Sequence, residues 1–273
     1  MMKSPYVRVV AVTLINIVLL GLMVKLGAFH YVKSTNVYIF GIAGTVGSLV
    51  TLLATLLFYK FVDKQPLRTL KFGMNRKQAL FSLTSIIVSV GMYVLYFMLL
   101  SKRGVISAHF PGDYFANPHV IPMFIMAAVA WFSVGLNEEV LYRGYFVANF
   151  KHASPGKLFL ISSVLFMASH VFQGLSPVYV LFLLGMAIVF IYIYIKSGSL
   201  LGAAIPHFIY DFLENHLIGN SSISILRIDG KPGDIHSIIL LVLFIVVHIT
   251  LVQVFFRQKM NRSLQNFSES ISA

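Results

Sequence analysis

Residues 119–143 read HVIPMFIMAAVAWFSVGLNEEVLYR, an apolar run that ends in two adjacent glutamates and, four residues later, an arginine. An apolar run of about 20 residues is long enough to cross the hydrocarbon core of a bilayer as a helix. Carboxylates at membrane depth are costly unless they meet a partner or face a water-filled cavity. The stretch therefore predicts both a membrane helix and a polar site at its end.

The rest of the chain has the same membrane character. Of its 273 residues, 58% are hydrophobic and 11% are charged, against roughly 25% charged in an ordinary soluble domain. These values exclude a soluble globular enzyme and a disordered chain. Apolar runs of helical length recur along the sequence and predict an all-α, polytopic membrane protein with about eight transmembrane helices, near 9–29, 37–61, 78–100, 119–137, 157–174, 176–195, 199–217 and 235–256.

The net charge of +12 comes from the loops and predicts the orientation. Lysine and arginine concentrate on the cytoplasmic side of membrane proteins. The connector 62–77 is strongly basic, and most other Lys and Arg share its side if both termini are cytoplasmic. We therefore expect a multi-pass integral protein with both ends inside, and the short loops favour a bacterial plasma membrane. The basic residues are expected to face anionic lipid, with no nucleic-acid partner.

The two glutamates are predicted to lie in different environments. Glu139 and Arg143 are four residues apart, share a helix face and can pair. Glu138 points about 100° away from Glu139. One carboxylate is thus neutralised while the other is free for general-base chemistry. The simpler alternative is that both glutamates cap or snorkel at a helix end.

Two further polar groups interrupt later apolar runs. His170 lies one turn after Phe166, which we expect to pack and at most to shape a pocket. His207 and Asp211 are four residues apart, so the carboxylate can orient the imidazole. A packing histidine and a polar helix end are the simpler interpretations of these two groups. Together with the glutamates, they suggest one constellation on three helices.

The residue types narrow the chemistry of such a site. The HExxH zinc motif is absent, no serine lies in a convincing glycine loop, and a second membrane aspartate is missing. Cysteine is also absent. What remains is a scheme in which Glu138 deprotonates a water oriented by His170 while His207 stabilises the oxyanion. This scheme requires no cofactor. Zinc on Glu138, His170 and His207 is the alternative, opposed by the positive charge of Arg143.

The three groups resemble the motifs of the CAAX protease and bacteriocin-processing family of intramembrane proteases (CPBP, also called the ABI family). That family shows E-E-x-x-x-R, then F-x-x-x-H, then H-x-x-x-N or a variant. Here the motifs are Glu138-Glu139 with Arg143, Phe166 with His170, and His207 with Asp211. The match covers about 120–217. It divides the chain into motif-free membrane helices at 1–118, a catalytic core at 119–217, and a loop, last helix and polar tail at 218–273.

The resemblance implies a helical membrane fold with a polar cavity, and a peptidase that hydrolyses a membrane-associated peptide or protein. It implies Glu138 as general base, His170 as the residue that orients water, and Glu139 and Arg143 as structural support. His207 and position 211 would bind the oxyanion. Asp211 departs from the common asparagine and, when ionised, cannot donate a hydrogen bond. A non-catalytic bacteriocin immunity or scaffold protein is the alternative. A transporter is disfavoured because no repeated halves are seen.

Overall fold

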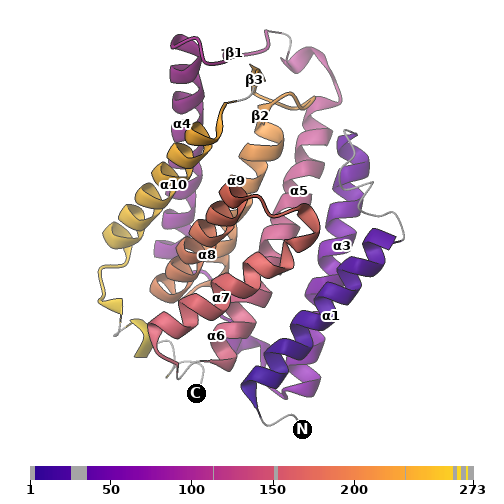
Figure 1. Ribbon diagram of the computed structural model, residues 1–273, viewed down its shortest axis with the longest axis vertical. Helices are drawn as coiled ribbons and strands as arrows, with labels where there is room; N and C mark the ends of the chain where they lie inside the picture. The colour runs from indigo at the N-terminus through magenta and orange to yellow at the C-terminus, as the bar shows by residue number, and fades with distance from the viewer. Residues whose placement is uncertain are drawn as a thin grey trace.

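The computed structural model describes residues 4–25, 36–112, 114–150, 153–230, 232–260, 263–265 and 269. The part of the first predicted span beyond residue 25 lies outside these ranges, as does most of the polar tail. Figure 1 shows a bundle of long helices that run roughly up and down the longest axis.

The elements follow the predicted apolar runs. The long helices are α1 (Pro5–Lys25), α3 (Val37–Leu57), α4 (Arg76–Lys102), α5 (Val120–Glu139), α8 (Pro177–Ser197) and α10 (Asp234–Phe255). Shorter helices complete the bundle: α6 (Phe146–Asn149), α7 (Pro155–Ser169) and α9 (Leu200–Phe212). Single turns of 3-10 or π-helix join or extend them: η1 (Phe58–Val62), η2 (Leu67–Leu70), η3 (Tyr114–Ala116), η4 (Val140–Tyr145), η5 (Val171–Gln173) and η6 (Leu213–Leu217).

Among the described residues, six helical segments are long and apolar enough to cross a membrane. They begin at Pro5, Val37, Arg76, Val120, Pro177 and Asp234. The two other predicted spans are shorter helices, since α7 has 15 residues and α9 has 13. Large apolar side chains also cover the outer faces of the bundle, including Leu53, Leu95 and Ile125, each more than half exposed. The all-α, multi-pass class is therefore confirmed, whereas the count of eight spans is not.

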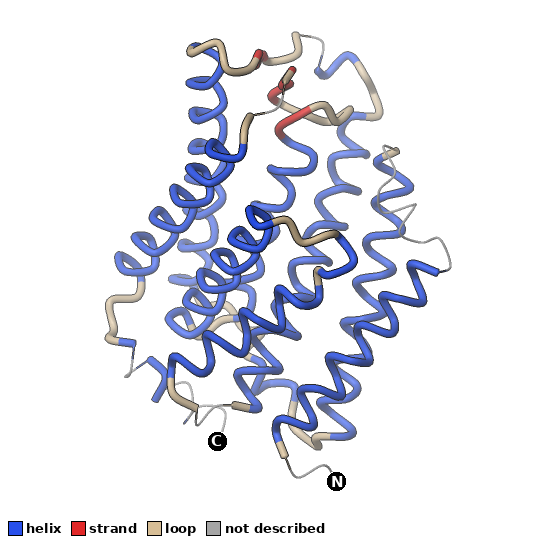
Figure 2. The backbone as a smooth tube through the Cα atoms, in the orientation of Figure 1, coloured by secondary structure: helices blue, strands red, loops and turns tan. Residues whose placement is uncertain are grey.

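A small sheet lies at one end of the bundle, and the sequence did not predict it. Its strands are β1 (Ser107–His109), β2 (Ile218–Gly219) and β3 (Leu226–Asp229), in the order β1-β3-β2. β1 pairs with β3 antiparallel, and β2 pairs with β3 in parallel. The sequence predicts irregular loops here, because strands this short carry no periodic signal and β1 pairs with a partner more than 100 residues away. Figure 2 shows the strands at the end opposite both termini.

We call the other end the basic end. There α1 begins, α3 ends, α4 begins, and α8 and α10 end. Lys60, Lys77, Lys196 and Arg257 lie in or beside these helix ends. Four basic side chains thus gather at this end of the bundle.

Helix α5 occupies the middle of the bundle and positions the site. It packs against α3 on one side and α9 on the other (Figure 1). Gly135 of α5 permits the second contact, because a Cβ built there would lie 3.3 Å from the backbone nitrogen of Phe208 and 3.6 Å from Cγ of His207. The close approach brings the end of α5 beside the imidazole on α9.

Candidate active site

The end of α5 changes from α-helix to π-helix at the two glutamates. Helix α5 ends at Glu139, and η4 continues as a π-helix over Val140–Tyr145. Single π-turns inside helices occur frequently at functional sites. All six residues of η4 are buried. The turn therefore holds Arg143 inside the bundle.

Glu139 and Arg143 form the predicted ion pair. Arg143 Nη1 lies 2.9 Å from Glu139 Oε1, and both side chains are fully buried. The guanidinium also donates from Nη2 to the carbonyl oxygen of Ala187, at 3.3 Å, and lies over the ring of Phe166 at 4.6 Å. Among the described residues, Oε2 of Glu139 and Nε of Arg143 have no hydrogen-bond partner, so the pair depends mainly on its own attraction. These contacts fix both side chains between α5, α7 and α8.

Glu138 lies on the other side of the helix, as predicted. Its side chain keeps 20% of its surface exposed and lines a cavity of about 670 Å³. Its Oε1 is 3.9 Å from Nε2 of His170, and its Oε2 is 3.5 Å from Nε2 of His207. Glu138 is therefore the accessible carboxylate of the pair, and both predicted histidines face it.

The end of α7 presents His170 to the cavity. The α-helix stops at Ser169, and the 3-10 turn η5 follows His170. Nδ1 of His170 lies 2.9 Å from the carbonyl oxygen of Phe166, so an Nδ1–H group can donate there. Such a bond leaves the Nε2 lone pair toward Glu138. The predicted neighbour Phe166 thus supplies a backbone acceptor, and its ring packs 4.8 Å from the imidazole.

His207 is held by more groups than the sequence predicted. Its Nδ1 is 2.9 Å from Oε1 of Glu139, and its Nε2 is 3.4 Å from Oδ2 of Asp211. Its ring stacks on Phe190, with centroids 4.4 Å apart. The predicted contact with Asp211 is present, but the shorter bond comes from Glu139, 68 positions away in the sequence. Glu139 therefore orients the imidazole, a task that the helical spacing had suggested for Asp211.

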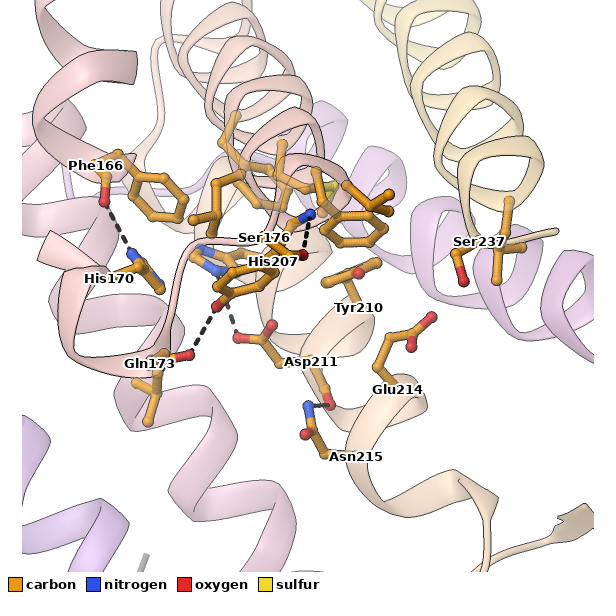
Figure 3. A pocket seen from close by; sticks show the side chains of 18 of the residues that line it. Phe166, His170, Gln173, Ser176, His207, Tyr210, Asp211, Glu214, Asn215 and Ser237 are labelled. Carbon is orange, nitrogen blue, oxygen red and sulfur yellow. Dashed lines mark hydrogen bonds and ion pairs between the residues drawn. The ribbon is translucent and has the colours of Figure 1, made fainter. Parts of the chain in front are cut away.

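The cavity extends from these groups between six helices. It is lined by residues of α4, α5, α7, α8, α9 and α10 and by the segment 173–176. Figure 3 shows His170, His207, Asp211 and Glu214 around this space. Several aromatic rings line the wall, among them Tyr96, Phe97, Trp131, Tyr179, Phe182, Phe190 and Tyr210. The sequence contains no local signal for these residues, because they come from four helices and meet only through packing.

Charged lining residues are all acidic among the described part of the chain. They are Glu138, Asp211, Glu214 and Asp234, and no Lys or Arg lines the cavity. The whole chain has 21 Lys and Arg against nine Asp and Glu. The cavity lining is therefore acidic although the protein as a whole is basic.

The donor set can also be compared with a metal site. The histidine nitrogens and carboxylates are types that zinc prefers, and Glu139 would orient His207 from behind. Over the described ranges, however, no group of three or more such side chains is arranged to hold a metal ion.

Residues 120–213 match the Rce1-like family, described as type II CAAX prenyl endopeptidase Rce1-like. The Rce1-like segment begins with α5 and ends at the start of η6, so it contains Glu138, Glu139, Arg143, His170, His207 and Asp211. The resemblance predicted from the three motifs is confirmed over this segment. No curated protein and no solved structure matches the chain.

The Rce1-like match supports a CAAX-protease-like peptidase in general terms. With the apolar helices, it supports an integral, multi-pass membrane protein that acts on a peptide or protein. The segment covers the helices that line the inner part of the cavity. Helices α1, α3, α4 and α10 lie outside it.

Proposed function

We propose that the protein is an intramembrane endopeptidase that hydrolyses a peptide bond of a membrane-associated peptide or protein. One observation carries the proposal: Glu138 faces the cavity with Nε2 of His170 and of His207 at 3.9 and 3.5 Å, while Glu139 is engaged by Arg143. A general base must be accessible to water and within reach of the group it deprotonates. Glu138 is accessible to water, whereas Glu139 is fully buried.

In the proposed reaction, a water molecule lies between Glu138 and His170. Glu138 takes one proton from the water, and the remaining O–H bond stays intact and donates a hydrogen bond to Nε2 of His170, whose own Nδ1–H is held by the Phe166 carbonyl oxygen. The water oxygen bonds to the scissile carbonyl carbon. When the C–N bond breaks, Glu138 returns the proton to the leaving nitrogen. Glu138 alone thus carries out both proton transfers, and His170 orients the water.

His207 supplies the oxyanion donor in this scheme. Glu139 accepts from Nδ1–H, so a second donor at Nε2 requires the imidazolium form. Three carboxylates surround the ring, at 2.9 Å for Glu139, 3.4 Å for Asp211 and 3.5 Å for Glu138, and they favour this positive form. In the resting site, carboxylate oxygens of Asp211 and Glu138 lie 3.4 and 3.5 Å from Nε2. In the proposed reaction, the forming oxyanion would accept a hydrogen bond from Nε2–H.

The surroundings of the site complete the proposal. We place the basic end on the cytoplasmic side, with both termini, in a bacterial plasma membrane, following the positive-inside rule. The reaction requires no cofactor in this scheme. The family that the motifs resemble also includes bacteriocin-processing and immunity proteins. A substrate screen would distinguish these roles for this protein.

The deciding experiment compares Glu138→Gln with Glu214→Gln in proteoliposomes. Both substitutions neutralise a carboxylate of the same cavity, but Glu214 is outside the proposed reaction. Farnesylated and unprenylated membrane peptides serve as substrates. We expect Glu138→Gln to lower kcat/KM by about 10²–10⁴-fold and Glu214→Gln to keep it within about 10-fold.

Three results would contradict the proposal. Equal cleavage by wild type and Glu138→Gln would remove the general base. Cleavage that stops with a chelator and returns with stoichiometric zinc would assign Glu138, His170 and His207 to a metal. Absence of cleavage in a folded wild-type protein, across a broad library, would favour the non-catalytic immunity or scaffold alternative.

A further inference from the structure

A second pocket lies at the basic end, away from the candidate active site. It has a volume of about 320 Å³ and lies where α4 begins and where α8 and α10 end. Its basic lining residues are Lys71, Lys77, Lys196 and Arg257. No Asp or Glu lines it among the described residues. Four cations from four separate segments thus converge on one space without an acidic residue in its wall.

The cations are arranged differently around the pocket. Lys77 and Arg257 are exposed at the rim, and Lys77 Nζ lies 5.6 Å from the centre of the Phe256 ring. Lys196 is buried at 8% exposure and donates to the carbonyl oxygen of Gln258. Burial lowers the pKa of Lys71. The ammonium groups of Lys71 and Lys196 are therefore partly removed from water.

The pocket continues into an apolar groove on the outside of the bundle. The groove is lined by Val254 and Phe255 and shares Lys77, Arg257 and Gln258 with the pocket. Val254 is 57% exposed on the face of α10 that would meet lipid tails. Three helices of membrane-crossing length have an end at this level: α4 begins here, and α8 and α10 end here. This cationic pocket lies at the end of membrane-length helices and continues into an apolar groove. Its charge and shape therefore match the headgroup and tail of a phospholipid better than a soluble anion.

We propose that this pocket binds the phosphate headgroup of an anionic phospholipid, with one acyl chain along Val254 and Phe255. The site is independent of the proposed peptidase activity. Lys77 and Arg257 would close over the phosphate from α4 and from the end of α10, while Lys71 and Lys196 form its inner wall. Selectivity for an anionic lipid follows from the four positive charges, because a zwitterionic headgroup adds its own cation to them.

The pocket wall is also bonded to the base of α9. Leu200 N donates to the carbonyl oxygen of Lys71 at 2.9 Å, and Ser199 Oγ donates to that of Gly73 at 2.9 Å. Gln78 Nε2 donates to the carbonyl oxygen of Ser197 at 2.6 Å. A bound lipid would therefore link the connector before α4 to the turn between α8 and α9. Since it would contact only the folded protein, the lipid should stabilise that state.

The test measures thermal unfolding in a neutral detergent with phosphatidylglycerol, phosphatidylcholine or inorganic phosphate added. The double variant Lys77→Gln/Arg257→Gln removes the two rim cations. Lys102→Gln/Arg103→Gln is the control, since it removes two exposed cations from the other end of α4 and changes the net charge equally. Native mass spectrometry counts the lipids retained by each protein.

We expect phosphatidylglycerol to raise Tm of the wild type and of the control by about 3 °C or more, and of the rim variant by much less. Mass spectra should show retained phosphatidylglycerol on the first two proteins only. Equal stabilisation of both double variants, or equal effects of phosphatidylcholine, would overturn the proposal. An equal effect of inorganic phosphate would overturn the assignment to a lipid and indicate a soluble phosphate ligand.

Discussion

At the scale of single residues, the candidate site depends on how Glu139 is neutralised. Its Oε1 contacts both Arg143 and Nδ1 of His207, each at 2.9 Å. One buried carboxylate thus joins the charge of η4 to the imidazole of α9. We therefore expect Glu139 and Arg143 to affect the proposed reaction through their neighbours rather than directly.

Arg143→Ala is expected to destabilise the protein by about 3–5 kcal/mol, because Glu139 would remain buried without its cation. The double variant Glu139→Gln/Arg143→Met should recover much of this loss, since no buried charge is left unpaired. Thermal unfolding in detergent measures both proteins. If the single variant were as stable as the wild type, the fully buried ion pair would not be part of the folded state.

At the scale of elements, the approach of α5 to α9 decides whether the site assembles. Gly135 faces the backbone of α9, with Phe208 N at 3.3 Å and Ala204 O at 3.5 Å from a Cβ built on it. Backbone atoms cannot rotate away as a flexible side chain does. A Cβ alone requires the neighbouring backbone to move by a few tenths of an ångström, and a larger side chain requires more.

Gly135→Val is therefore expected to cost about 1–3 kcal/mol and to reduce peptidase activity by moving His207 away from Glu138. Gly91→Val is the matched control, because a Cβ on Gly91 of α4 meets no atom within 4 Å. Unfolding and cleavage are measured on both. Similar losses in the two variants would show that valine itself, and not the helix contact, is responsible.

The junction after α3 contains a second buried carboxylate, at the basic end. Asp63 follows η1, is 2% exposed and lies 3.9 Å from Arg8 of α1. Burial raises the pKa of Asp63 above 3.8, although Tyr145, Arg8 and Asn149 oppose the shift. Asp63 therefore faces α1 from the junction after α3.

This raised pKa predicts a pH dependence of stability. The folded state binds the Asp63 proton more tightly than the unfolded chain does, so its contribution is fully present below about pH 3.8 and is lost as the pH rises through the folded-state pKa. Asp63→Asn should remove this part of the profile. Tm measured from pH 4 to 7 for both proteins tests the prediction. Parallel profiles would show that Asp63 does not titrate in this way.

At the scale of the whole molecule, charge is separated between two spaces. The central cavity is lined by Glu138, Asp211, Glu214 and Asp234, and the pocket at the basic end by four cations. The cavity wall is also rich in aromatic rings, whose faces attract cations. The acidic cavity favours substrates that bring positive charge and opposes those that bring carboxylates.

Peptides with Lys or Arg close to the scissile bond should therefore have higher kcat/KM than matched peptides with Asp or Glu, by about 10-fold or more at low salt. A C-terminal amide should improve cleavage close to the terminus, because it removes a carboxylate. Raising the ionic strength should reduce both preferences. A preference for acidic peptides would contradict the charge of the cavity.

The sequence alone determined the membrane class, the helical character and the motif residues that gather at the candidate site. Apolar runs and the i,i+4 spacing of Glu139 and Arg143 are local features, and local spacing is enough to place two side chains on one helix face. The same spacing predicted the contact between His207 and Asp211. The motif residues of the Rce1-like segment are likewise readable from the amino-acid order, because each lies within a short pattern.

Only the tertiary structure decided how the helices end and which groups meet across them. Hydropathy could not show that α7 stops at Ser169, because the apolar composition continues past its last turn. The bond between Glu139 and His207, the sheet of β1 with β3, and the cationic pocket each join segments far apart in the chain. Helix packing decides which side chains from distant segments come into contact. No short stretch of sequence determines the separation between two such segments in the folded protein.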